Sequence, residues 1–168
     1  EPDEEVDLGL LVRASRALLN EVCRDRAWIE LDLDERVWPV LGSVVELERV
    51  IVNLVVNARD AMPAAGGESV VAVRNRDPDP GAPVSCPSAR QHVVLQVRDR
   101  GVGMDAETLD KVFEPFFTSK EDQGGTGLGL PTVREIVRRH GGAIQIDSEL
   151  GRGTEVTIRL PRLNGDPA

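Results

Sequence analysis

Two asparagines stand four residues apart in the stretch LERVIVNLVVNARDAM, residues 47–62. Apolar residues recur there at helical spacing, so Asn53 and Asn57 share one rim of a predicted helix, with Asp60 on the same side. Asparagine is a mediocre helix former, and two at one rim need a reason. Their amide oxygens could face a pocket, and one could hold a divalent cation. A solvated helix edge explains the same pattern, and this segment alone slightly favours that simpler explanation.

A carboxylate ends a predicted strand in VVLQVRDRGVGMDA, residues 93–106. The glycines after Asp99 match the G-x-G-x-x-A dinucleotide pattern, but the following helix is short and no second parallel strand ends in an acidic residue. A P-loop is excluded too, because the chain contains no Gly-Lys-Ser/Thr. We interpret Asp99 as an acceptor for the exocyclic amine of adenine. Gly101 and Gly103 would let a planar ligand approach the backbone.

The third group of candidates lies in FEPFFTSKEDQGGTGLGL, residues 113–130. All three phenylalanines of the chain occur here, and they could equally form a small satellite core. Lys120 precedes glycine-rich backbone and a helix start, where free N–H groups and the helix dipole attract anions. A loop lysine is usually just solvated. A cation beside a glycine hinge is, however, typical of a lid over phosphates.

Periodicity predicts the elements that must position these residues. Ser43 and Glu46 fit a capping box that opens the helix bearing the asparagines. Strands separated by turns favour antiparallel pairs, hence a mixed sheet with helices on one face and not a doubly wound sheet. We interpret residues 77–89 as a loop insertion that the hairpin between two predicted strands tolerates. The predicted helices are 6–26, 43–62, 105–112 and one that ends near Arg139, and the predicted extended segments are 28–33, 38–41, 68–76, 91–99, 143–148 and 154–160.

Composition narrows the class of protein. The 168 residues carry a net charge of −9, which argues against nucleic acid as the main partner. No apolar run reaches the roughly 18 residues of a membrane span, and Cys23 and Cys86 read as free thiols, so a cytoplasmic domain is expected. His92 is expected at the surface. His140 is expected at a helix C-terminus, where a partly positive imidazole suits the dipole.

Four segments in this order, NLVVNARDAM, DRGVG, FEPFFTSK and GGTGLGL, resemble the catalytic ATP-binding domain of two-component sensor histidine kinases. That family belongs to a superfamily with the ATPase domains of gyrase, the Hsp90 chaperones and the mismatch-repair protein MutL. The resemblance covers about residues 6–161. It implies a Bergerat-type fold, an α/β (α+β) two-layer sandwich in which a mixed, mostly antiparallel five-stranded sheet is backed by three helices, with ATP and Mg²⁺ as ligands.

The resemblance also assigns roles to residues. Asn57 resembles the magnesium-binding residue and Asp99 the adenine-reading residue, while Lys120 is a candidate phosphate contact. Asn53 stands where the ATPase branches have a water-activating Glu; because it cannot act as a general base, it favours phosphoryl transfer over hydrolysis. Asn57 and Lys120 are the expected catalytic residues. Together with Asn53, Asn57, Asp99 and Lys120, the expected nucleotide-binding residues are Gly101, Gly103, Phe113, Phe117, Gly125, Thr126, Gly127, Leu128, Gly129 and Leu130.

Some positions depart from the family pattern. Asp60 stands where many kinases carry a basic residue, and Thr118 stands where many carry Arg, so Arg59 becomes a weak second candidate for the γ-phosphate contact. Arg100 replaces the usual Asn after the adenine-reading Asp. Neither histidine has the context of the family's phosphoacceptor.

The resemblance thus predicts an enzyme that transfers the γ-phosphoryl group to a histidine on a separate helical dimerisation/phosphoacceptor domain and serves a response regulator receiver domain. It predicts no nucleic-acid partner, no membrane insertion and a monomeric isolated domain. The expected organisation is a linker remnant over 1–5, the domain over 6–161 and a frayed tail over 162–168. A serine kinase of the anti-sigma-factor type and a nucleotide-sensing binding module are the alternatives.

Overall fold

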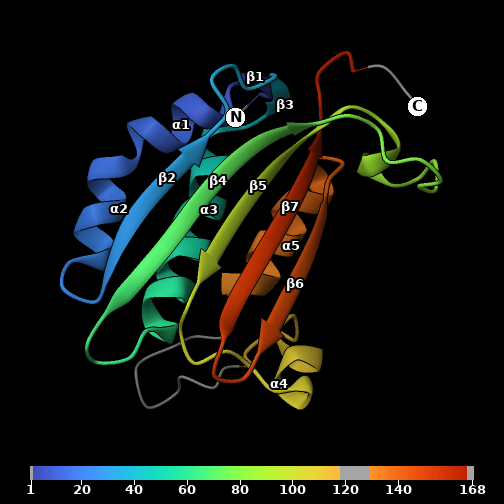
Figure 1. The fold of residues 1–168 in the computed structure, drawn as a ribbon. Helices are drawn as coiled ribbons and strands as arrows, with labels where there is room; N and C mark the ends of the chain where they lie inside the picture. The colour runs from blue at the N-terminus through green and yellow to red at the C-terminus, as the bar shows by residue number, and fades with distance from the viewer. Residues whose placement is uncertain (1, 118–128, 166–168) are drawn as a thin grey trace.

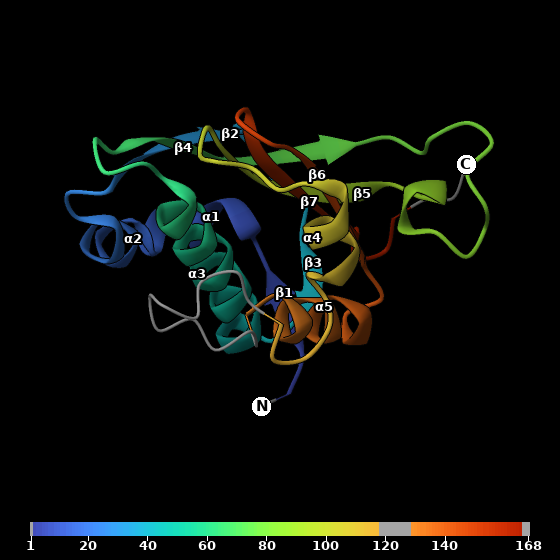
Figure 2. The same ribbon diagram turned by 90° about the horizontal axis from the view of Figure 1, so that it is seen from below.

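A computed structural model describes residues 2–117 and 129–165, which fold into a sheet with helices packed on one of its faces (Figures 1 and 2). The small strands β1 and β3 form a separate antiparallel pair. The elements are β1 Glu4–Val6, α1 Leu8–Ala14, α2 Arg16–Cys23, β2 Ala27–Leu33, β3 Val40–Gly42, α3 Val44–Ala61, β4 Gly67–Arg76, the 3-10 turn η1 Pro87–Ala89, β5 His92–Asp99, α4 Ala106–Lys111, α5 Gly129–Arg139, β6 Ala143–Glu149 and β7 Gly153–Pro161.

The main sheet has five strands in the order β2-β4-β5-β7-β6. β2 and β4 are parallel, because α3 carries the chain back between them, and the other three pairings are antiparallel. The predicted mixed, mostly antiparallel sheet is therefore confirmed. Figure 2 shows α1, α2, α3 and α5 below the sheet, with α4 near the ends of β5, β6 and β7.

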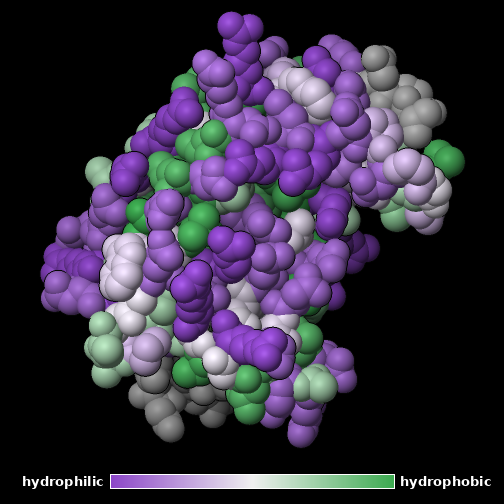
Figure 3. Space-filling view, in the orientation of Figure 1, coloured by the Kyte–Doolittle hydropathy of each residue, from purple (hydrophilic) through white to green (hydrophobic). Residues whose placement is uncertain are grey.

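The core lies between the sheet and the helices. Strand alternation sends one set of side chains inward, where α3 and α5 cover them with apolar stripes. The inward strand residues include Val71, Val73, Val93, Leu95, Val97, Val156, Ile158 and Leu160, and the helix residues that meet them include Leu47, Ile51, Leu54, Val133, Ile136 and Val137. Figure 3 shows the opposite face of the sheet, which is largely hydrophilic.

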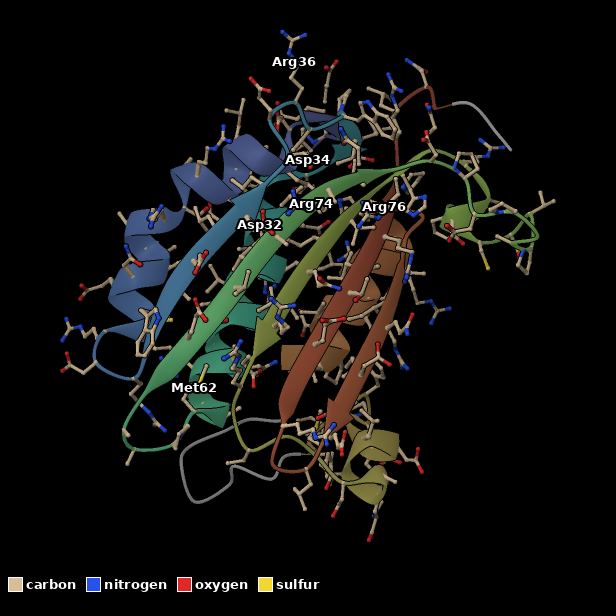
Figure 4. The ribbon with its side chains drawn as sticks, in the orientation of Figure 1. Asp32, Asp34, Arg36, Met62, Arg74 and Arg76 are labelled. Carbon is tan, nitrogen blue, oxygen red and sulfur yellow. The ribbon has the colours of Figure 1, made fainter. Side chains whose placement is uncertain are left out.

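An ion-pair network stands on that outer face (Figure 4). Arg74 of β4 pairs with Asp32 and, at 3.0 Å, with Asp34. Burial raises the pKa of Asp34, but hydrogen bonds from the Asn75 N–H and from Arg74 outweigh it and hold that pKa below its ordinary value. This network ties β2 to β4 at the solvent-facing surface.

The start of α3 departs in detail from the predicted capping box. Ser43 Oγ accepts the Glu46 N–H at 3.3 Å, as predicted. The Ser43 N–H, however, donates to His140 Nε2 at 3.1 Å, and the His140 Nδ1–H donates to the Ile136 carbonyl at 2.7 Å. Both ring nitrogens of His140 are thus engaged at the C-terminal end of α5, and Nε2 also lies 3.9 Å from Glu46 Oε2.

Other local expectations also need correction. The helix predicted over 6–26 is divided at Ser15 into α1 and α2, and both the Ser15 N–H and the Ser15 hydroxyl donate to the Leu11 carbonyl. His92 is buried, with Nδ1 bonded to the Arg90 carbonyl, because its strand end is covered and not open to solvent.

The two ends of the described chain are more ordered than the expected linker and tail. Residues 4–5 belong to β1. The Arg162 N–H donates to the Gln91 carbonyl, the Leu163 N–H donates to the Pro39 carbonyl, and the Arg162 guanidinium lies 4.5 Å from the centre of the Trp38 ring. Across residues 2–117 and 129–165, we find no helix with the length and apolar character that a bilayer crossing needs.

Candidate nucleotide site

α3 carries both asparagines, and Asn57 lies beside the start of α5. Both side chains are partly exposed, while Leu54 and Ala58 on the neighbouring face are buried. A methyl group at Gly129 would lie 3.7 Å from Asn57 Oδ1, so the first turn of α5 lies against the Asn57 amide. The structure therefore brings together two predicted site residues from distant parts of the sequence. Asn57 offers an amide oxygen that could bind a cation, and Gly129 begins a helix.

Asp99 is 7% exposed at the end of β5. Its Oδ1 accepts the Gly101 N–H at 2.8 Å, which turns the chain sharply after the strand. The Val102 N–H then donates to the Ala61 carbonyl, at the end of α3, at 2.9 Å. Since Ala61 lies about one helical turn after Asn57, these contacts connect Asn57 with Asp99 along one wall.

Residues 99–104, which we call the adenine loop after the base that Asp99 is predicted to bind, are held on their other side by the β6–β7 turn. The Val102 carbonyl accepts the Gly151 N–H at 2.7 Å, and the Met104 N–H donates to Ser148 Oγ at 2.9 Å. Gly103 has φ +68°, and a Cβ there would collide with the Glu149 carbonyl. The loop is thus clamped between α3 and the β6–β7 turn.

The clamp gives Gly101 and Gly103 a role that differs from the predicted one. The sequence predicts that Gly101 and Gly103 let a planar ligand approach the backbone. In the structure, the protein's own backbone fills the space in question: Ala61 carbonyl atoms meet a Cβ at Gly101, as Glu149 does at Gly103. Both glycines therefore shape the loop that places Asp99, and a direct contact with nucleotide stays a prediction.

Four polar side chains stand in a row across the sheet beside this loop. Cα pairing sets Ser69 opposite Asp99, Asp99 opposite Thr154, and Thr154 opposite Ser148, on β4, β5, β7 and β6. Directly paired residues point to the same face, with Cβ atoms about 4.5–5.5 Å apart. We call these four residues the polar row. Sequence reasoning found only Asp99, because strand register is not visible in the sequence.

A cavity of about 620 Å³ touches three members of the polar row, Asp99, Thr154 and Ser148. Its lining comes from both faces of the sheet end, because Arg98, Glu155 and Asp147 pair with one another on the face opposite to Asp99, and neither Asn57 nor α5 lines it. Ile146 and Leu109 add apolar surface to it. Arginines and carboxylates complete the lining: Arg98, Arg100, Arg152, Asp147, Glu149 and Glu155.

The phenylalanines differ in exposure. Phe113 is partly exposed, and the Arg134 guanidinium of α5 lies 4.8 Å from the centre of its ring. Phe117 is also partly exposed, whereas Phe116 is 72% exposed with φ +66°, a conformation rare for a bulky residue. The three rings therefore do not form one satellite core.

The rest of the predicted phosphate side can be placed only in part. Leu130 packs against the core, as expected. Five of the residues predicted from the glycine-rich segment lie outside the described residues: Lys120, Gly125, Thr126, Gly127 and Leu128.

Comparison with known proteins decides the family. Residues 42–164 match the family described as "Histidine kinase-, DNA gyrase B-, and HSP90-like ATPase". The chain belongs to this family. The predicted resemblance to the catalytic ATP-binding domain of sensor histidine kinases is thereby confirmed, and with it the fold class.

Curated members of the family are similar over nearly the whole chain. The sensor kinase CckA of Brucella abortus is 42% identical over 95% of this chain, and the sensor histidine kinase ZraS of Escherichia coli is 32% identical over 94%. This chain spans 17% and 31% of the lengths of those two proteins. The relatives are therefore larger proteins that contain a comparable domain.

Solved structures of family members match in shape. The mycobacterial sensor histidine kinase MprB superposes with a TM-score of 0.75 at 29% identity, covering 98% of this chain and 99% of that one. The catalytic domain of the histidine kinase ThkA gives 0.76 at 25% identity, covering 96% and 99%. Near-complete coverage on both sides shows that this chain matches one catalytic domain.

Arg59, the weak candidate for the γ-phosphate contact, is engaged elsewhere in this family member. Its Nη1 donates to the Val22 carbonyl at 3.1 Å, and its Nε donates to Asp60 Oδ1 at 2.9 Å. These bonds direct the guanidinium toward α2. The geometry therefore disfavours Arg59 as a phosphate ligand.

Proposed function

We propose that this chain binds ATP with Mg²⁺ and transfers the γ-phosphoryl group to a histidine on a separate helical dimerisation/phosphoacceptor domain, in two-component signal transduction. The contact between Asn57 and the first turn of α5 carries the proposal. It sets an oxygen donor beside the N-terminus of an 11-residue helix, where backbone N–H groups attract phosphate. Similarity to sensor histidine kinases supports the same reaction.

The residues divide the work of binding. Asp99 accepts a hydrogen bond from the exocyclic amine of adenine, and the clamped adenine loop fixes the position of its carboxylate. The α5 N-terminus orients the phosphates. Together they hold the γ-phosphoryl group for attack by an incoming nucleophile, so catalysis rests on positioning and charge neutralisation.

The residues present fit a magnesium ion that is shared with the nucleotide. Mg²⁺ prefers oxygen ligands and usually keeps waters and substrate phosphates in its shell. Within the described ranges, no group of three or more His, Cys, Asp or Glu side chains could hold a metal by itself. Asn57 Oδ1 would supply one protein ligand. When bound, the ion would neutralise charge on the phosphates.

Asn53 and the histidines support transfer to another domain. Asn53 cannot take a proton from water, so the site lacks a general base at that position. His92 is 1% exposed, and the His140 side chain is 4% exposed and bonded at both ring nitrogens. Neither ring is free to accept a phosphoryl group, so the acceptor lies elsewhere. The proposal places the domain in the cytoplasm, where ATP is available, with a receiver domain downstream.

The test uses labelled ATP, this chain and the separately produced phosphoacceptor domain of the parent kinase. Acid-labile, alkali-stable label on the acceptor supports a phosphohistidine product. Acid-stable label would instead support a serine kinase, and nucleotide binding without transfer would support a nucleotide-sensing module. Asn57→Ala should abolish transfer, while Asn20→Ala, on the exposed side of α2, should not.

A further inference from the structure

Ser148, at the β6 end of the polar row, makes three contacts through one hydroxyl. Its Oγ lies 2.9 Å from the Met104 N, 3.1 Å from the Gly153 carbonyl oxygen and 2.8 Å from Thr154 Oγ1. The first contact reaches the adenine loop, and the other two reach the start of β7.

The single hydrogen of the Ser148 hydroxyl determines which group donates in each of the three bonds. A serine hydroxyl has one hydrogen and two lone pairs. The Gly153 carbonyl can only accept and the Met104 N–H can only donate, so the Ser148 hydrogen goes to Gly153 and one lone pair goes to Met104. The remaining lone pair must receive the Thr154 O–H. Only this assignment satisfies all three contacts at once.

The consequence concerns Thr154, which stands directly opposite Asp99 on the inward face of the sheet. With its hydrogen committed to Ser148, the Thr154 hydroxyl offers only lone pairs. Asp99 and Thr154 then present acceptors side by side. Such a pair suits an amino group on a base and repels a carbonyl oxygen at the same position.

We propose that Ser148 is a positioning residue that sets base selectivity: it holds Thr154 as an acceptor beside Asp99 and so favours a 6-aminopurine over a 6-oxopurine. The proposal rests on the proposed ATP site. Without the Ser148 hydroxyl, the Thr154 O–H is free to rotate and donate, which a 6-oxo group would accept.

The experiment measures the dissociation constants of ATP and GTP, each with Mg²⁺, by competition against a fluorescent nucleotide. Ser148→Ala should lower the preference for ATP over GTP about tenfold, as expected for one redirected hydrogen bond. Ser148→Thr, which keeps the hydroxyl, should retain the preference. Thr157→Val is the matched control, since this buried hydroxyl of β7 bonds Gln96 on the opposite face of the sheet.

A double-mutant cycle keeps the idea testable if Ser148→Ala also loosens the turn. In a Thr154→Val background, Ser148→Ala should change the ATP:GTP preference no further, because it acts through the Thr154 hydroxyl. An unchanged preference in Ser148→Ala, whatever happens to Tm, would overturn the proposal, as would an equal change in the control. Failure of the unmodified chain to bind ATP would instead refute the proposed function.

Discussion

Replacing Gly103 by alanine tests the clamp on the adenine loop. The backbone at Gly103 has φ +68°. A Cβ there would lie well inside 3.0 Å of the Glu149 carbonyl oxygen, whereas real Cβ atoms essentially never come within 3.0 Å of another heavy atom. Gly151 is a matched control, because its φ of +82° is equally unusual but a Cβ there meets nothing within 4 Å. The pair separates the cost of the backbone conformation from the cost of the collision.

The expected magnitudes follow from these two environments. Gly151→Ala should cost only the left-handed backbone term, about 1 kcal/mol. Gly103→Ala carries the same backbone cost, and the new Cβ must also push the adenine loop away from the β6–β7 turn. That movement strains the Val102–Gly151 and Met104–Ser148 hydrogen bonds, each worth about 1 kcal/mol. The total is about 3 kcal/mol.

Thermal unfolding followed by far-UV circular dichroism measures the difference. At roughly 2–4 °C per kcal/mol for a domain of this size, Gly151→Ala should lower Tm by about 2–4 °C and Gly103→Ala by about 6–12 °C. Because the shifted loop carries Asp99, Gly103→Ala should also weaken ATP binding about tenfold or more. Equal losses of stability in the two variants, with ATP affinity intact in both, would refute the clamp.

Three further outcomes are expected. Asp99→Ala should abolish ATP binding in calorimetry while the fold persists, with Asp110→Ala on exposed α4 as the control; unchanged affinity would refute the adenine assignment. Asn57→Ala should weaken nucleotide binding with Mg²⁺ and change it little without Mg²⁺, so an equal loss in both conditions would indicate a purely structural role. The pKa of Asp34 is lowered in the folded state, so the unfolded chain binds more protons as pH falls toward 3.8. The loss of stability caused by Asp34→Asn should therefore be complete at neutral pH and should shrink as pH drops through the folded pKa. A difference in unfolding free energy between Asp34→Asn and the unmodified chain that stays constant down to about pH 2 would contradict this.

The fold was largely predictable because local signals agree with it. α3 begins at the Ser43 cap, and the alternating strands appear at their predicted places. The strand β1 was missed because three residues are too few for a periodic pattern. Burial of His92 reflects tertiary packing, which no local pattern encodes.

The candidate site was predictable in its residue types and less so in its geometry. Asn57 and Asp99 follow from position and chemistry. That Asn57 lies beside Gly129, and that Gly101 and Gly103 face protein backbone, depends on how distant segments meet. Thr154 and Ser148 carry no signal of their own in the sequence. They become candidates only when strand register sets them in line with Asp99.

The central claim is that Asn57 and Asp99 bind the two ends of one nucleotide. A crystal structure of this chain with Mg²⁺ and a non-hydrolysable ATP analogue tests it most directly. The account predicts the adenine amino group within hydrogen-bond distance of the Asp99 carboxylate, Asn57 Oδ1 about 2.1 Å from the metal, and the phosphates at the N-terminus of α5. A nucleotide bound elsewhere, or bound here without either contact, would contradict it.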